Sequence, residues 1–273
     1  VSIPDWLSGK ARVVAVDGLC QSVSAVQELE VALGEGCLVV DVPDMLQELW
    51  DDRPQIPVTP VTTLDVECFG GIPRMEKISW LRKWMLIEGY DKVLLSSLDE
   101  VAWMLNVRGS DIEYNPLVIS YLLVSQDYVK WFVKKTVTDS ELDPDTLDIF
   151  AELRMDGVDV EDYDAVFFAL SDFGSDEGSG VIFIDPSTLN SNVYKYISGC
   201  FPADSIVCGT SPVILEKSVK TPSEIENLRQ TYIDDGVAME CFIHWLEAEV
   251  ASGREVTEWE ASRTKRDGGV KSP

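Results

Sequence analysis

Histidine is almost absent from this chain, which carries one, His244, among 273 residues. A Ser-His-Asp or Cys-His device would have to use that residue. His244 follows Phe242 and Ile243 in an apolar helical stretch, which indicates a histidine at the surface or edge of a packed helix. The sequence also lacks a G-x-S-x-G elbow, a Walker loop and paired Cys or His at zinc spacing. It therefore predicts no catalytic or metal site of these kinds.

Basic side chains are also scarce: 22 Lys and Arg stand against 48 Asp and Glu, a formal net charge of −26. Such a field repels phosphate backbones, so we expect no nucleic-acid partner. Two interpretations of the charge stay open. It either provides a solvated surface that keeps the protein soluble, or it attracts a basic partner such as a histone or a basic peptide.

Long apolar runs are missing too. None approaches the roughly 20 residues needed to span a bilayer, and residues 1–9 show no basic segment followed by an apolar one. We therefore expect no membrane partner, no secretory signal and a cytoplasmic location. The six cysteines form no C-x-x-C pair, and we interpret them as reduced thiols in a reducing compartment. They are Cys20, Cys37, Cys68, Cys200, Cys208 and Cys241.

The first 50 residues read as a β-α-β-α piece. Strands are expected at 12–16 and 37–40, and helices at 22–33 and 43–50. This piece is too small to bury its own sheet. Residues 51–61 (DDRPQIPVTPV) contain three prolines, which exclude a helix or an inner strand. We place a domain boundary there.

A longer alternation of elements follows and predicts an α/β domain that ends near Val213. Two of its strands are close enough for an antiparallel hairpin, and residues 171–180 (SDFGSDEGSG) read as a polar loop. The expected helices are 73–88, 98–105 and 145–155, and the expected strands are 92–96, 117–124, 128–133, 165–169 and 181–185.

The C-terminal part predicts one long amphipathic helix over residues 220–250. Thr221 or Ser223 can cap its start, and Pro222 suits its first turn. Residues 251–273 lose apolar content and end in a basic, Gly-rich tail, which we expect to be disordered.

The most distinctive stretch is 99–116, DEVAWMLNVRGSDIEYNP. Asp99 can cap a short helix. Arg108 and Asp111 lie close enough in sequence to pair across a turn in which Gly109 permits a positive φ. Three side chains are expected in a core, namely Ala102, Trp103 and Leu105, and the dipeptide Asn115 and Pro116 is expected to lead in an extended form into the next strand.

The same stretch resembles the D-E-(I/V)-A-W-L-x-N-(L/I)-R-G-x-D-(I/V)-x-x-N-P pattern of cytosolic-type Xaa-Pro aminopeptidases (aminopeptidase P). The pattern lies in the creatinase-like N-terminal region of these M24 metallopeptidases. Residues 3–7, 48–54, 218–238 and 256–258 are similar to the family in the same order, so the resemblance runs from about residue 3 to about residue 260. The matched motif residues, which we expect to be structural, are Asp99, Glu100, Trp103, Arg108, Gly109, Asp111, Asn115 and Pro116.

This resemblance implies an α/β fold of the creatinase/prolidase N-terminal type, with a mixed sheet flanked by helices. It implies that residues 1–60 are the C-terminal part of a first creatinase-like domain and that 61–215 are a second one. Residues 216–273 would be the start of a truncated catalytic pita-bread domain, beginning with its opening helix.

The resemblance also implies an activity for the parent enzyme. The family removes the N-terminal residue from peptides whose second residue is proline, with two divalent ions, usually manganese. Its metal ligands follow the part present here, so we assign no catalytic and no metal residue to this chain. We expect a non-catalytic portion that shapes substrate access and supports the catalytic domain.

The implied partners are proline-containing peptides for the full-length enzyme and a second copy, bound through the catalytic domain. Two alternatives remain. One is a catalytically inactive, histone-chaperone-like creatinase module for basic partners, and the other is a degenerate product that ends at Pro273.

Overall fold

The computed structural model describes residues 1–47, 49–54, 57–134, 143–175 and 180–266. They form two compact units. One comprises residues 1–66 and 72–219, and the other comprises residues 67–71 with the chain from residue 220 onward.

The chain begins with a small β-α-β piece, preceded by a short helix. The parallel pair β1 and β2 starts its register at Val13 and Leu38. Ser22 caps the intervening helix, and its hydroxyl accepts a hydrogen bond from the Ala25 N–H at 3.2 Å. The elements are α1 (Ile3–Leu7), β1 (Val13–Val16), α2 (Val23–Leu33) and β2 (Leu38–Asp41).

The helix expected at 43–50 is wrong, because the described residues there form turns. Asp44 adopts a positive φ of 36°, and its N–H donates to the Asp17 carboxylate at 3.1 Å. A helix needs αR geometry at this position, and the hydrogen bond to Asp17, 27 positions earlier in the chain, holds the turn instead.

A mixed six-stranded sheet forms the centre of the first unit, in the order β10-β9-β4-β6-β7-β8. β6 and β7 make the expected antiparallel hairpin, and β6 also runs antiparallel to β4. The other three neighbouring pairs are parallel. The strands are β4 (Lys92–Leu95), β6 (Ser120–Ser125), β7 (Val129–Val133), β8 (Val158–Asp162), β9 (Ile182–Ile184) and β10 (Ile206–Cys208).

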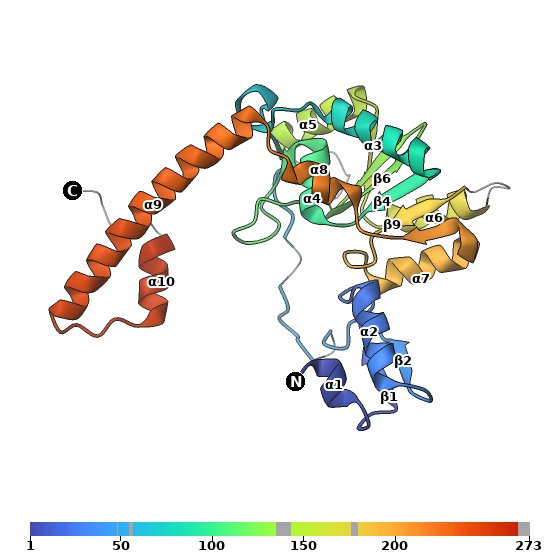
Figure 1. Cartoon of the computed structure of the whole chain (residues 1–273), viewed down its shortest axis with the longest axis horizontal. Coiled ribbons are helices and arrows are strands. Elements are labelled where there is room, and N and C mark those ends of the chain that lie inside the picture. The colour runs from blue at the N-terminus through green and yellow to red at the C-terminus, as the bar shows by residue number, and fades with distance from the viewer. Residues whose placement is uncertain (48, 55–56, 135–142, 176–179, 267–273) are drawn as a thin grey trace. The chain divides into compact units, whose positions relative to one another are not determined.

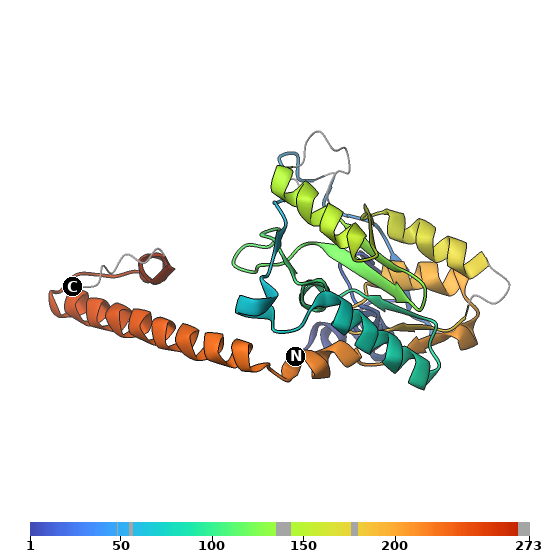
Figure 2. The same cartoon turned by 90° about the horizontal axis from the view of Figure 1, so that it is seen from above.

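Both faces of this sheet are covered, as alternate residues of its inner strands show. Leu122 belongs to one apolar cluster and Leu123 to the other, because successive side chains of a strand point to opposite faces. Helices α3, α4, α5 and α8 pack in the first cluster, and α6 and α7 in the second (Figure 1). Figure 2 looks onto the face covered by α3 and α5.

Local signals explain most of these helices. Gly89, in a left-handed conformation, ends α3, and the Asp143 carboxylate caps α5. The bounds are α3 (Arg74–Glu88), α4 (Leu98–Leu105), α5 (Pro144–Met155), α6 (Ala165–Ser175), α7 (Ser191–Cys200) and α8 (Pro212–Ser218), with a short 3₁₀ turn at Ala203–Ser205.

The strand expected at 165–169 is wrong, because these residues begin α6. Val166, Ala169 and Leu170 are buried while Phe168 is 79% exposed, which is helical rather than alternating spacing. The loop expected at 171–180 is also wrong for residues 171–175, because α6 extends to Ser175. Residues 176–179 lie outside the described part.

The elements around the sheet that were not expected from the sequence include β8, α7, β10 and α8. β8 carries three acidic residues among its five, and β10 has three residues. Both are edge strands of the sheet, each paired with one neighbour. Their apolar patterns are weak, so the sequence carries little signal for them.

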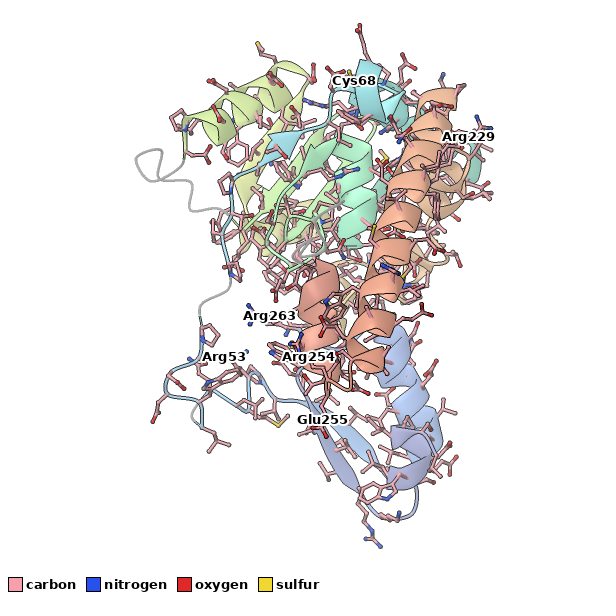
Figure 3. The ribbon with its side chains drawn as sticks, turned by 90° about the vertical axis from the view of Figure 1, so that its left-hand side faces the viewer. Arg53, Cys68, Arg229, Arg254, Glu255 and Arg263 are labelled. Carbon is pink, nitrogen blue, oxygen red and sulfur yellow. The ribbon has the colours of Figure 1, made fainter. Side chains whose placement is uncertain are left out.

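The second unit is built on α9 (Pro222–Ala251), beside the π-helical turn η1 (Val66–Gly70) and α10 (Glu258–Arg266). Thr221 and Glu224 form a reciprocal capping box at the start of α9. Near that end the Asn227 amide donates to the Cys68 carbonyl at 2.7 Å; Figure 3 labels Cys68 on its turn.

Residues 258–266 form α10, which the sequence did not predict. The disorder expected for the C-terminal tail is therefore wrong for residues 263–266, which belong to this helix. Arg254 lies between α9 and α10 and pairs with Glu249 and Glu260, so it links the two helices (Figure 3). The remainder, 267–273, lies outside the described residues.

Two further expectations concern the whole chain. Within the described ranges, none of the helices is both long and apolar enough to cross a membrane. The six cysteines, each in a described segment, are thiols rather than disulfides, as expected.

Candidate functional site

The motif stretch 99–116 starts inside α4 and leads to the lower-numbered end of β6. Asn106 ends α4 in a left-handed conformation, with φ of 56°. The chain then forms β5 (Val107–Arg108), which pairs antiparallel with β3 (Thr62–Thr63). The motif is therefore placed between the sheet and the segment that precedes α3.

Asp111 ties three parts of the chain together. Its buried carboxylate accepts hydrogen bonds from the Thr59 N–H at 2.9 Å and the Thr59 hydroxyl at 2.7 Å. Its second oxygen accepts from the Ile119 N–H at 3.0 Å. A buried carboxylate needs such donors, and here they secure the start of the loop and its return to β6.

The pairing expected between Arg108 and Asp111 is wrong. The Arg108 guanidinium donates instead to the main-chain carbonyls of Ala102 at 3.1 Å and Val107 at 2.8 Å. Burial lowers the pKa of Arg108. The Arg108 side chain therefore connects the C-terminal end of α4 to β5. Asp111 makes a separate set of contacts, with Thr59 and Ile119.

The positive φ expected for Gly109 is also wrong, because Gly109 is not among the glycines with left-handed geometry. A Cβ at this position would lie 2.6 Å from the Cγ2 of buried Val118. A glycine at position 109 thus allows the chain to pass close to Val118, and no left-handed turn is involved.

Trp103 takes part in a second junction through Lys77, a residue that the sequence did not single out. The Lys77 ammonium lies 4.2 Å from the centroid of the Trp103 ring and donates to the Trp103 carbonyl at 2.7 Å. It also donates to the Asn106 side chain at 2.6 Å, and Asn106 donates to the Ile72 carbonyl at 3.0 Å. Lys77 is 2% exposed. Its position in an ordinary amphipathic helix gave no sequence signal for this role.

Asp99 does not cap α4, contrary to expectation, because the N-cap residue is Ser97. The Asp99 carboxylate accepts hydrogen bonds from Ser97 and from Lys217 of α8. Burial alone would raise the pKa of Asp99, but these hydrogen bonds lower it.

Glu100 lies on the buried side of α4 and accepts a hydrogen bond from the Ser211 hydroxyl at 2.6 Å. Burial, with the charges of Asp99 and Asp185, raises the pKa of Glu100. The two adjacent acidic residues of the motif thus both contact the segment around α8.

Asn115 and Pro116 close the exposed tip of the loop. The Asn115 N–H donates to the Ile112 carbonyl at 3.1 Å, and the Asn115 carbonyl accepts from the Leu117 N–H at 2.7 Å. The Pro116 carbonyl receives the Gly109 N–H at 3.5 Å. These contacts shape the loop and leave the tip in solvent.

The described contacts of the motif residues join elements of the fold to one another. Within the part of the chain that the structure describes, no group of three His, Cys, Asp or Glu side chains could hold a metal ion. His244 is exposed on α9. A cavity of about 360 Å³ lies among β1, α2, β2 and α7, lined by Val23, Gln27, Asp41, Tyr194 and Lys195 among others and by none of the motif residues.

Comparison with known proteins identifies relatives of this fold. Residues 52–224, more than half of the chain, match the family described as Creatinase/Prolidase N-terminal domain. The chain is 29% identical over 268 residues to Xaa-Pro aminopeptidase 1 of Dictyostelium discoideum, which covers 94% of this chain and 40% of that protein. It is 36% identical over 207 residues to Xaa-Pro aminopeptidase 2 of Mus musculus, which covers 74% of this chain and 29% of that protein.

A solved structure agrees with these relatives. The X-prolyl aminopeptidase of Caenorhabditis elegans, described as a cytosolic enzyme with a di-nuclear active site, matches with a TM-score of 0.80 and 28% identity. The match covers 97% of this chain and 42% of that one. This chain thus spans less than half the length of each of these three proteins. It belongs to the creatinase/prolidase N-terminal domain family, and its homologues are Xaa-Pro aminopeptidases.

Proposed function

We propose that this chain is the non-catalytic N-terminal portion of a metal-dependent aminopeptidase that removes the N-terminal residue from Xaa-Pro peptides. The observation that carries the proposal is the match, over nearly the whole chain, to 42% of the C. elegans enzyme. The motif supports it, because Asp111, Arg108 and Glu100 are engaged in contacts between elements. In the proposal, side chains engaged in such contacts stabilise the arrangement of the helices and strands and take no part in a reaction.

The proposed role has two parts, substrate access and support of a catalytic domain. In this proposal residues 1–60 complete a first creatinase-like domain, 61–215 form a second, and 216–273 begin the catalytic domain. The exposed apolar side chains of α9 favour a further partner for that helix; they include Leu228, Tyr232, Ile233 and Val237.

A di-nuclear metal centre does not fit the described residues, because they contain no group of three ligands that could hold an ion. We therefore derive no chemical step for this chain. In the proposal, the two divalent ions of the parent enzyme, manganese by analogy with the family, are held by residues outside this chain.

The proposed substrates are proline-containing peptides of the parent enzyme, and the proposed location is the cytoplasm. A cytosolic relative supports the location. A homodimer through the catalytic domain completes the proposal.

The role is tested by removing residues 1–219 from the product of the longest reading frame that contains this chain. We expect the remainder to lose most of its activity on an Xaa-Pro tripeptide, or to accept larger peptides that the intact product excludes. Unchanged kcat/KM for both substrate sizes would contradict the proposed role. A variant with Glu152→Gln, an exposed substitution on α5, controls for the handling of the protein.

The net charge of −26 favours one other candidate, a binding module for basic partners. Titration with a histone mixture at physiological salt tests it. Saturable binding that survives a modest increase in salt would support this module, whereas binding that disappears is non-specific attraction between charges.

A further inference from the structure

Helix α8 is the last helix of the first unit, and it ends at Ser218, shortly before the second unit begins at Lys220. It has seven residues, and Val213 is its buried one. Ile214 and Leu215 are 47% and 74% exposed. A helix of this length has little stability of its own, so its contacts with the rest of the first unit decide whether it stays in place.

The N-terminal end of α8 is held through Ser211, its N-cap. The Ser211 hydroxyl accepts from the Val213 N–H at 3.3 Å and donates to the Glu100 carboxylate at 2.6 Å. The Ser211 N–H donates to the Asp185 carboxylate at 2.8 Å. Glu100 and Ser211 are 2% and 3% exposed, so water cannot readily replace these bonds.

The C-terminal end of α8 is held through Lys217, whose ammonium pairs with the Asp99 carboxylate. This pair is partly exposed, at 28% for the Lys217 side chain and 50% for that of Asp99. Adjacent residues of an α-helix point about 100° apart. Neighbouring positions in α4 therefore reach opposite ends of α8, one through a buried contact and the other through an exposed one.

We propose that Asp99 and Glu100 form a two-point latch that holds α8 against α4 and sets how often α8 is released from it. Three charged groups face Glu100, namely Asp99 on α4, Asp185 after β9 and Lys217 on α8. The latch is a conformational device near the C-terminal end of the first unit. It stands on contacts within the first unit and does not depend on the activity of the parent enzyme.

Hydrogen exchange of the whole chain tests this proposal, with the amides of residues 216–219 reporting on α8 and those of Leu122 and Leu123 reporting on the sheet. Ser211→Ala should speed exchange in α8 by about tenfold, because it removes a buried bond to a charged group. Lys217→Gln and Asp99→Asn should each speed it by about twofold to fivefold. The double variant of Lys217 and Asp99 should be slower than the product of the two single effects predicts, because the two substitutions share the contact between these side chains.

Glu152→Gln removes one exposed carboxylate from α5 and should leave both sets of amides unchanged. Lys217→Gln keeps the test valid if Ser211→Ala does not fold, because it alters a partly exposed side chain. The latch proposal would be overturned if Lys217→Gln left the exchange rate of the α8 amides at its wild-type value. It would also be overturned if exchange of the α8 amides and of the sheet amides became faster to the same extent. Additive effects of Lys217→Gln and Asp99→Asn would also overturn it.

Discussion

The carboxylate of Asp111 receives both the N–H and the hydroxyl of Thr59, at 2.9 and 2.7 Å, across 52 positions of the chain. This contact joins the segment before β3 to the motif loop. The loop is thereby fixed at a point where it has neither a helix nor a long strand to hold it.

Asp111→Ala should lower the free energy of unfolding by about 2 to 4 kcal/mol, because the half-buried donors of Thr59 and Ile119 lose this buried acceptor. Urea unfolding measures the change. Glu113→Gln, two residues later and exposed, should stay within about 0.5 kcal/mol of the wild type. Equal effects for both substitutions would show that Asp111 does not secure the junction.

Gly109→Ala should be destabilising by about 1 to 3 kcal/mol, since its new methyl would lie 2.6 Å from the Val118 Cγ2. Val118→Ala removes that carbon and should make Gly109→Ala milder in the double variant than in the wild-type background. The two costs would simply add if close approach were not the reason for the glycine. The measurement is a double-mutant cycle of unfolding free energies.

Lys77→Met should lower the free energy of unfolding by about 2 to 3 kcal/mol, because the Trp103 carbonyl and the Asn106 side chain lose a charged donor. Lys83→Met, on the exposed part of the same helix, is the matched control and should change little. If thermal and urea unfolding cannot tell the two variants apart, the buried ammonium makes no net contribution to the junction.

Glu100 and Asp99 should give opposite pH dependences. The pKa of Glu100 is raised, chiefly by burial, so its contribution to stability is full below the pKa of an unfolded glutamate and is lost as pH rises through its folded pKa. Glu100→Gln keeps an acceptor for Ser211 without the charge. The variant should therefore gain stability relative to the wild type as pH rises through that window.

The pKa of Asp99 is lowered by its hydrogen bonds from Lys217 and Ser97, which outweigh burial. Its contribution is present above the pKa of an unfolded aspartate and is lost as pH falls through its folded pKa. Asp99→Asn should thus be less stable than the wild type near neutral pH and equal to it in strong acid. Parallel pH profiles for the Asp99 and Glu100 variants would contradict at least one of the two assignments.

Local signals in the sequence predicted the elements that have clear ends. Gly89 ends α3, Asp143 caps α5 and Thr221 caps α9, and each acts within a few residues of its own position. The resemblance carried by residues 99–116 also led to the correct fold family. The apolar run at 165–169 failed because five residues cannot distinguish a buried strand from the buried side of a helix.

The contacts of the motif could not be predicted, because their partners are distant in sequence. Asp111 binds Thr59, Glu100 binds Ser211, and Lys77 reaches Trp103. Sequence proximity instead suggested a pair between Arg108 and Asp111, yet main-chain carbonyls are nearer to that guanidinium. No pattern of residue types marks such contacts before the fold brings them together.

The most direct test of the proposed function is hydrolysis of Arg-Pro-Pro with added Mn²⁺ by this chain, beside the product of the longest reading frame that contains it. We predict that the longer product releases the N-terminal arginine and that this chain does not. Metal-dependent cleavage by this chain alone would contradict the account, because it would place a working site among the residues to which we assign only structural contacts.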